Sequence, residues 1–513
     1  MREIILLFLC CALFSGCADG LEVILQPDGV RHRAEYAVPL VDSRTTLGDL
    51  VGQVDDRVRL TVDPDGLLRF IYSDTVPAVT SESVFSELEL LGRGIPLSIT
   101  QRRQALAFPL PREIALDELR VKGGQFTYSL PNIHDQPVRI ELRIPNATRN
   151  GGPLRVTGLL PAYSGSGDPP TLSNTDDPLD ISGYAFDFSA DSLVIEYSVD
   201  DLGGNPLDPA KNTIAVLTNL EFSYLEGYFG RSPYPGISDV LEIDFFEHYL
   251  SGEVAFVDPL IRINVRNGFG IPSRAVVDEL YIITADGERV EVTGEVVTDG
   301  FPFNYPRTEG GNAYTTYLVD KNNSNVLQLL GTKPVALHYR IGALLNPDAD
   351  PDVVGYLADT STYSATLDVE LPLYGSARDF QVRDTFPINL GESYGEVTEV
   401  SFRITTDNEL PFDLSLTGIF VDSLGNALAD LTDGELLVVE ASAVDAGGNS
   451  TEVKQTTSDV TFTGAQLEQL RRANRLLLNT TFATTDNGTE NVRVTNEQEL
   501  RVRIGARLTV NNQ

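Results

Sequence analysis

The sequence predicts an all-β protein made of tandem antiparallel β-sandwich-like modules with a few short helices. Two observations support this fold class. Apolar and polar residues alternate with a period of two in many short segments, a pattern typical of strands with one buried and one solvated face. Pro and Gly cluster between the segments, notably at 164–170 and 346–352, where loops are expected.

The strand segments appear along the whole chain. The first predicted hairpin covers 57–72 and turns at Asp65-Gly66, and a second covers 280–292 and turns at Asp286-Gly287. Further alternating segments are found at 138–144, 261–265, 400–404 and 500–504. We expect each of them to be a strand in an antiparallel sheet.

Helical signals are few. In the segment 464–478, leucines and an alanine recur at a spacing of three to four residues, which predicts the longest helix. A shorter helix is expected at 325–330, with Ser324 as its N-cap. The segments 46–51 and 81–91 show the helical pattern less regularly.

An internal repeat divides the second half of the chain. The segment 261–272 resembles 400–411, and each is followed by a strand, a polar turn and another strand. Pro272 and Pro411 are 139 positions apart (411 minus 272), and the matching helical segments are separated by a similar offset. The repeat predicts two modules, and the strand at 138–144 with its following Pro-Asn resembles a degenerate third copy.

These boundaries give a predicted domain organisation in chain order. The expected units are a signal peptide at 1–16, an N-terminal β-rich region at 17–114, a β-sandwich module at 115–239 and two further β-sandwich modules at 240–375 and 376–513.

The N-terminal pattern predicts an export signal. An apolar run at 4–14 is too short to span a bilayer but suits a signal peptide. The sequence that follows, Leu13-Phe14-Ser15-Gly16-Cys17, resembles a bacterial lipobox, although Phe14 replaces the usual aliphatic residue. That resemblance implies lipidation of Cys17 and a lipid anchor in the outer membrane, on its periplasmic or cell-surface side.

All three cysteines, Cys10, Cys11 and Cys17, lie in this segment. The processed chain would therefore contain no disulfide, no cysteine-based zinc site and no thiol nucleophile. The formal charge of −36 disfavours nucleic acid as a partner, because a polyanion would meet a surface of its own sign.

No catalytic motif is present. The four histidines are scattered, and the sequence has neither a nucleophile elbow nor a phosphate-binding loop. We therefore expect a protein that is not an enzyme and has no cofactor. One possible exception is calcium at Asp348, Asp350 and Asp352, where alternate carboxylates could converge in a turn. This segment departs from the EF-hand pattern, since Val353 occupies the glycine position.

Aromatic residues gather at 224–234 and at Phe245-Phe246, near a predicted module boundary. They either line an apolar or glycan-binding groove or pack the junction between modules.

The strand–Asn–Pro–strand unit resembles the water-stress domain of late-embryogenesis-abundant proteins. The chain as a whole is similar to large outer-membrane lipoproteins of Bacteroidota, through the segments 34–40, 46–50 and 368–375. These features predict a non-catalytic envelope lipoprotein with a structural or interaction role and an envelope protein or glycan as partner. Two alternatives remain open: a glycan-binding accessory lipoprotein and a protein that binds lipid or another apolar ligand.

Overall fold

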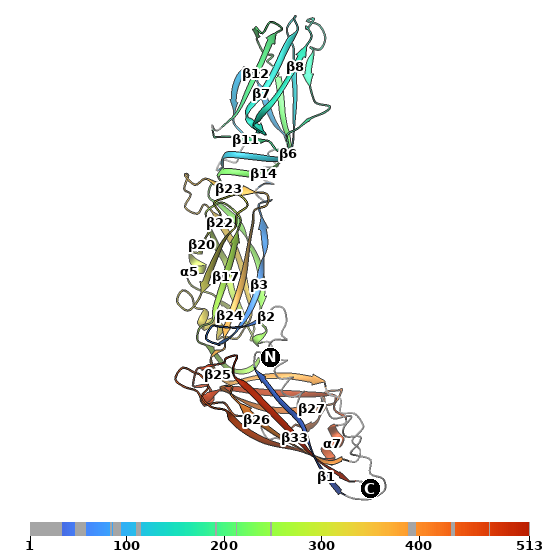
Figure 1. The fold of residues 1–513 in the computed structure, drawn as a ribbon, viewed down its shortest axis with the longest axis vertical. Coiled ribbons are helices and arrows are strands. Elements are labelled where there is room, and N and C mark those ends of the chain that lie inside the picture. The colour runs from blue at the N-terminus through green and yellow to red at the C-terminus, as the bar shows by residue number, and fades with distance from the viewer. Residues whose placement is uncertain are drawn as a thin grey trace.

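Figure 1 shows a computed structural model in which three β-rich modules are stacked along the long axis of the molecule. It describes residues 33–46, 58–82, 85, 94–108, 114–189, 192–211, 213–246, 249–387, 397–431, 437–470 and 472–511. We call the modules upper, middle and lower, after their places in Figure 1. Every pairing between the described strands is antiparallel and the described helices are short, which confirms the predicted all-β class.

The middle module packs two five-stranded sheets against each other. The first has the order β2 (Val58–Val62), β3 (Leu68–Thr80), β24 (Thr362–Pro372), β17 (Leu260–Asn267) and β21 (Ala313–Val319). The second has the order β15 (Ser232–Glu242), β22 (Pro334–Leu345), β18 (Ser273–Thr284) and β19 (Arg289–Glu291), with β20 (Phe301–Phe303) beside β18. The Tyr339 hydroxyl of β22 donates to Asp74 Oδ2 of β3 at 2.9 Å and so joins the two sheets.

The lower module has the same two-layer design. Its first sheet has the order β1 (Arg33–Thr46), β33 (Glu499–Asn511), β26 (Val397–Asn408) and β30 (Lys454–Thr463). Its second has the order β16 (Tyr249–Phe256), β25 (Tyr374–Pro387), β31 (Arg475–Thr484), β27 (Phe412–Val421) and β28 (Ala427–Asp430), with β29 (Leu437–Val439) beside β27 and β32 (Val492–Arg493) beside β25. The rings of Phe420 and Phe462 meet between the two layers, with centroids 6.3 Å apart.

The upper module is one continuous sheet of twelve strands. Its main path runs β13 (Pro206–Leu207), β12 (Leu193–Asp201), β7 (Val138–Arg149), β11 (Ala185–Asp187), β6 (Ala115–Pro131), β14 (Thr213–Tyr228) and β23 (Gly355–Ala358). The side strands are β4 (Ile95–Ile99), β5 (Arg103–Leu106), β8 (Gly152–Leu160), β9 (Thr171–Ser173) and β10 (Leu179–Asp180). Register shifts along the β6–β14 pair bend the sheet.

The chain runs from the lower module to the upper module and then back to the lower one. It starts in the lower module with β1, passes through the middle with β2 and β3, and builds most of the upper module before β15 and β16 bring it down. The predicted region 17–114 is therefore divided among all three modules. The predicted boundary at 239 falls inside β15 and that at 375 inside β25. The cause is pairing over long sequence distances, as in β1 with β33, which leaves no local pattern in the sequence.

Both predicted hairpins form at the expected turns. Val62 pairs with Leu68 across the first turn, and Ile283 pairs with Arg289 across the second. At the first turn Gly66 has a φ of 85°, a conformation that glycine adopts without strain.

The predicted helix at 464–478 is too long. Only α7 (Gly464–Leu470) is helical, and residues 475–484 form β31. In that strand Leu476 and Leu478 are buried with a period of two, and β31 pairs with both β25 and β27. Pairing on both sides satisfies the backbone and outweighs the local helical pattern.

The shorter predicted helix is confirmed as α6 (Val326–Leu330). Its N-cap is Asn325 and not the predicted Ser324, although Ser324 Oγ accepts a hydrogen bond from the Val326 N–H at 3.2 Å. Two further helical turns, α5 (Glu295–Thr298) and α8 (Thr485–Gly488), and the 3-10 turn η1 (Asp244–Phe246) were not predicted. Most of 46–51 and 81–91 lies outside the described residues.

The topology of the middle module recurs in the lower one. In the middle module, β17 pairs with β21 and β24 while β18 pairs with β19 and β22. In the lower module, β26 pairs with β30 and β33 while β27 pairs with β28 and β31. The helices α6 and α7 occupy the same place in the order of elements. Duplication of one module would produce this correspondence.

Candidate functional site

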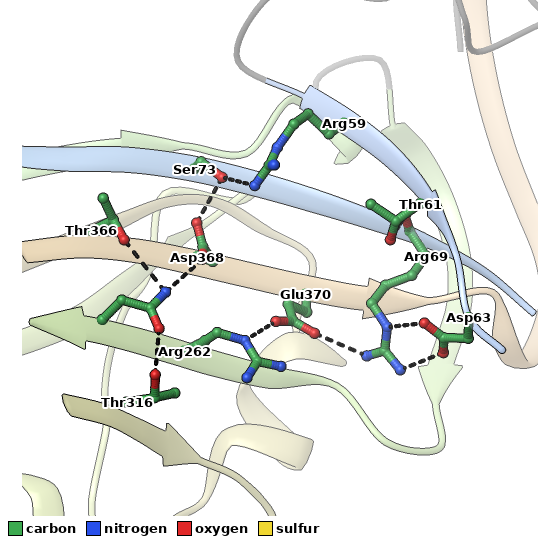
Figure 2. Close-up of polar contacts among 11 residues, drawn as sticks. Arg59, Thr61, Asp63, Arg69, Ser73, Arg262, Thr316, Thr366, Asp368 and Glu370 are labelled. Atoms are coloured by element: carbon green, nitrogen blue, oxygen red, sulfur yellow. Dashed lines mark hydrogen bonds and ion pairs between the residues drawn. The ribbon is translucent and has the colours of Figure 1, made fainter. Parts of the chain in front are cut away.

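A network of polar side chains lies on one face of the first sheet of the middle module (Figure 2). Its centre is two carboxylates, Asp368 and Glu370, on β24. The neighbours Leu367, Val369 and Leu371 point into the apolar core, so alternation along the strand places both carboxylates on the opposite face. They are nevertheless buried, with 8% and 4% exposure, because arginine and serine side chains cover them.

Glu370 lies between two arginines. Arg262 of β17 donates from Nε to Glu370 Oε1 at 2.5 Å, and Arg69 Nη1 of β3 forms an ion pair with Oε2 at 3.3 Å. Arg69 also contacts both carboxylate oxygens of Asp63, at 3.4 and 2.9 Å. The hydrogen bond to Glu370 raises the pKa of Arg262 above its ordinary value, so the guanidinium stays charged.

Asp368 is satisfied by neutral donors. Ser73 Oγ donates to Oδ1 at 2.7 Å and Asn264 Nδ2 donates to Oδ2 at 3.2 Å. Asn264 is held by the Thr316 hydroxyl at 2.8 Å, and Ser73 accepts from Arg59 at 3.3 Å. Figure 2 shows that these contacts tie β2, β3, β24, β17 and β21 together.

Two neighbouring carboxylates raise the question of glycoside hydrolysis, which needs one acid to donate a proton and a second group that faces the substrate. Here each carboxylate already accepts hydrogen bonds or ion pairs on both oxygens. The arrangement is therefore suited to holding five strands in register.

A buried asparagine occupies the same structural place in each module. Asn132, Asn267 and Asn408 follow or end the strands β6, β17 and β26, and each is at most 1% exposed. In each case the side-chain oxygen accepts from the N–H two residues later, at 2.8 to 2.9 Å.

The amide nitrogen of each asparagine donates to a backbone carbonyl about one hairpin further along the chain. Asn132 donates to Pro161 at 2.7 Å, Asn267 to Asn304 at 3.0 Å and Asn408 to Glu440 at 2.9 Å. Counted back from Pro272 and Pro411, the repeated segments 261–272 and 400–411 set Asn267 opposite Thr406. The Pro-Asn that follows the strand at 138–144 is Pro145-Asn146. The structure instead matches Asn267 with Asn408, because the loop before Pro411 is two residues shorter.

Three hairpin loops share the string Asp-x-x-Gly-Asn, a signal that sequence reasoning missed. They are Asp201–Asn205, Asp422–Asn426 and Asp445–Asn449. In each loop one aspartate oxygen accepts from two backbone N–H groups, and the asparagine side chain donates back to the same carboxylate. Hydrogen bonds from the loop's own asparagine lower the pKa of each aspartate below its ordinary value.

These loops predict a loss of stability in acid. A carboxylate with a lowered folded-state pKa adds stability above its unfolded-state pKa of about 3.9, and that stability is lost as the pH falls through the folded-state value. Replacing Asp201, Asp422 and Asp445 together with Asn keeps an oxygen acceptor but removes the titration. We expect a smaller fall in the urea midpoint between pH 6 and pH 3 than in the wild type.

The control for this experiment is Asp286→Asn, in the exposed turn between β18 and β19. Its acid dependence should follow the wild type. Equal falls in the triple variant and the wild type would contradict the assignment.

The calcium candidate does not form a cluster. Asp348, Asp350 and Asp352 lie in the loop after β22, and Asp350 Oδ1 accepts from the Asp352 N–H at 2.9 Å. Among the described residues, no group of three or more His, Cys, Asp or Glu side chains is placed to hold a metal ion. The loop turns through Ala349 at a φ of 52°, and the three carboxylates do not converge.

The remaining predicted features are the lipidated cysteine, the aromatic residues and the membrane anchor. Cys17 and the signal peptide at 1–16 lie outside the described residues. Aromatic residues from both predicted groups pack at junctions between modules: Tyr224 stacks on Tyr356 at the upper junction, with ring centroids 5.9 Å apart, and Phe245 contacts Phe70 and Phe256 at the lower one. Phe245 also lines an apolar space beside the lower sheet. Within the part of the chain that the structure describes, no helix has the length and apolar character needed to cross a bilayer.

Comparison with known proteins gives no family. No family model and no curated protein sequence matches the chain. A solved structure of a candidate secreted protein from Parabacteroides distasonis aligns over 93% of this chain and 99% of its own, at 12% identity and a TM-score of 0.25. A structure of the infectious bursal disease virus Gx strain aligns over 90% of this chain and 82% of its own, at 9% identity and a TM-score of 0.15. With such low TM-scores, neither description transfers to this chain.

Proposed function

We propose that the chain is a non-catalytic, lipid-anchored protein of the cell envelope that presents its upper module to a protein partner. The observation that carries this proposal is the path of the chain. Cys17 lies 16 residues before β1, and β1 belongs to the lower module, where it pairs with the last strand of the chain. A lipid on Cys17 would therefore tether the lower module and leave the upper module at the opposite end of the stack (Figure 1).

Backbone pairing and side-chain contacts connect the upper and middle modules. The strand β23 lies between the middle-module strands β22 and β24 in the chain, yet it joins the sheet of the upper module by pairing with β14, from Tyr224 opposite Ala358 to Gly227 opposite Gly355. Arg120 lies over the Tyr224 ring at 4.1 Å and forms an ion pair with Glu309 at 2.8 Å. These contacts support a fixed orientation of the two modules.

The lower junction is braced by the tip of the β2–β3 hairpin. The Leu68 N–H donates to the Val494 carbonyl at 3.0 Å, and the Val494 N–H donates to Leu373 at 2.9 Å. Phe245 is in edge contact with Phe70 of the middle module and Phe256 of the lower one, with centroids 5.7 and 5.9 Å away. Backbone hydrogen bonds together with aromatic packing favour a rigid junction, so the middle module would act as a spacer between the other two modules.

The far end of the upper module exposes aliphatic side chains. Ile133 and Leu202 lie in its end loops, with 48% and 65% exposure. Ile214 and Leu159, with 49% and 65%, lie on strands close to the same end, since Ile214 pairs with Ser129 near the end of β6. Exposed aliphatic groups favour a protein partner over a sugar, which prefers aromatic rings.

The test is co-purification from native membranes with wild-type chain and an Ile133→Asp, Leu202→Asp double variant. We expect the wild type to recover a stoichiometric protein partner and the double variant to lose at least about 90% of it, because charges would enter the contact. Cys17→Ser should move the protein out of the membrane fraction.

The matched control is Leu424→Asp. Leu424 is 86% exposed in the loop Asp422–Asn426 of the lower module, which has the same turn motif as the loop carrying Leu202. It should keep the partner. A monomeric wild type without a partner, or equal loss in the control, would overturn the proposed contact, and membrane retention of Cys17→Ser would overturn the anchor.

A further inference from the structure

The outer face of the first sheet of the middle module is locally positive. Four arginines and two carboxylates are the charged groups on this face of the described strands, which leaves a charge of +2: Arg59, Arg69, Arg262, Arg266, Asp368 and Glu370. Asp63 lies just beyond β2 and pairs with Arg69, and the face stays positive when it is included. The whole chain has a formal charge of −36, so this face is the opposite of its surroundings and attracts an anion.

Two of these arginines keep hydrogen-bond donors for a ligand. Arg262 donates through Nε to Glu370, and Arg266 donates through Nε to Asn312 Oδ1 at 3.1 Å. Within the described part of the chain, the terminal nitrogens of both guanidinium groups have no hydrogen-bond acceptor, and no carboxylate forms an ion pair with Arg266. Arg266 is exposed, so its planar fork can receive a carboxylate from solvent.

An exposed aromatic ring lies beside Arg266. Tyr314 of β21 stands directly opposite Arg266 in the β17–β21 pair and is 69% exposed. Side chains at such positions have Cβ atoms about 5 Å apart. No other aromatic side chain described in the structure is exposed to this degree. The ring offers a flat apolar surface, and its hydroxyl remains in water.

The neighbouring positions on this face are polar and fixed. Thr316 of β21 is exposed and donates its hydroxyl hydrogen to Asn264 Oδ1 at 2.8 Å, so its oxygen can still accept a hydrogen bond. Figure 2 shows Thr316 and Arg262 on this face. Arg262 and Arg266 are four residues apart on β17, a distance of about 13 Å at 3.3 Å per residue. The binding groups therefore extend over more than one sugar ring.

We propose that this face binds a short acidic glycan, in which the Tyr314 ring packs on the C–H face of one sugar and the Arg266 guanidinium binds a sugar carboxylate. An acidic peptide would satisfy the arginines but would not need the exposed ring. A long polyanion would extend beyond this face onto the acidic surface around it. A short glycan avoids that repulsion, because charges separated by more than about 8 Å are largely screened at physiological salt.

The experiment is titration calorimetry of the full chain, in about 0.15 M NaCl, with tetrasaccharides of galacturonic, mannuronic and guluronic acid. We expect at least one of them to bind the wild type. Arg266→Gln should weaken that binding by about ten- to a hundredfold, the range for a hydrogen bond to a charged group. Tyr314→Ala should weaken it by about two- to tenfold, whereas Tyr314→Phe keeps the ring and should leave the affinity unchanged.

Two controls test whether the effect is local and depends on the sugar's charge. Arg403→Gln removes the same charge from an exposed sheet face of the lower module and should leave the affinity unchanged. The methyl esters of the same tetrasaccharides lack the carboxylates and should bind the wild type at least about tenfold more weakly. All the substituted residues are exposed, and urea unfolding without a ligand checks that each variant folds.

The site would be overturned if none of the three acidic tetrasaccharides binds the wild type, if their methyl esters bind equally well, or if Arg403→Gln and Arg266→Gln lose affinity equally. Tetraglutamate that binds as tightly as the best tetrasaccharide, with no effect of Tyr314→Ala, would assign the face to an acidic peptide instead. The Ile133→Asp, Leu202→Asp variant should bind the glycan normally, so this result is independent of the partner contact at the upper module.

Discussion

Replacing Glu370 with leucine is expected to lower the free energy of unfolding by about 3–5 kcal/mol. The substitution leaves Arg69 and Arg262 without their shared carboxylate on β24, and Arg69 is already 84% buried by its neighbours, with only 16% of its side chain exposed. Arg69 keeps its ion pair with Asp63, but Arg262 loses its carboxylate partner, and a partly buried guanidinium without a partner costs more than the ion pair contributes. Urea unfolding followed by tyrosine fluorescence measures the change, since the chain has 19 Tyr and no Trp.

Two control variants test whether the loss of stability arises because the ion pair is buried. Arg403→Ala breaks the exposed ion pair with Asp459, in which the arginine side chain is 70% exposed, and should cost less than about 1 kcal/mol. A triple variant with Arg69→Met, Arg262→Met and Glu370→Leu removes both arginines and the carboxylate between them and should recover most of the lost stability, with Asp63 left partly exposed to water. A cost below 1 kcal/mol for Glu370→Leu would contradict the structural role of the network.

Replacing Asn408 with alanine is expected to cost about 2–4 kcal/mol. The change leaves the Leu410 N–H and the Glu440 carbonyl without their partner in a site where the asparagine is 1% exposed. Asn132→Ala and Asn267→Ala should cost similar amounts, because each asparagine joins a strand end to a distant carbonyl in the same way. Denaturant midpoints of the three variants measure the effect.

The comparison variant is Asn312→Ala, whose side chain accepts one hydrogen bond from Arg266 at an exposed position. It should cost less than about 1 kcal/mol. If one of the three buried asparagines behaves like Asn312, the structural equivalence of the three modules would be wrong at that position.

Local patterns in the sequence were sufficient for the strands and turns. Alternation at 57–62 and the Asp65-Gly66 turn predicted the first hairpin, and the same reasoning predicted the second. The repeat between 261–272 and 400–411 was visible because both copies place apolar residues on the same strand face before a polar turn. These features depend on neighbours in the chain, and a single sequence contains that information.

The candidate site could be predicted only in part. The buried asparagines and the Asp-x-x-Gly-Asn loops are present as sequence strings. The offset between Pro272 and Pro411 nevertheless sets Asn267 opposite Thr406 and not opposite Asn408, because the loops before the two prolines differ by two residues. Asp368 and Glu370 could not be selected among 74 acidic residues. Both lie on the outer face of the sheet, and Glu370 is buried there because arginines from β3 and β17 cover it.

By itself, the sequence determined the all-β class, the hairpin turns, the helix α6 and the recurrence of one strand pattern, because these follow from residue spacing and turn chemistry. Only the tertiary structure decided that β1 closes the lower module against β33, that residues 475–484 extend as β31, and that Tyr314 lies opposite Arg266 on one sheet face. Each of these depends on pairing or packing between segments far apart in the chain. The free energy of such a contact depends on the residues of both segments, so the sequence of one segment is not enough to predict it.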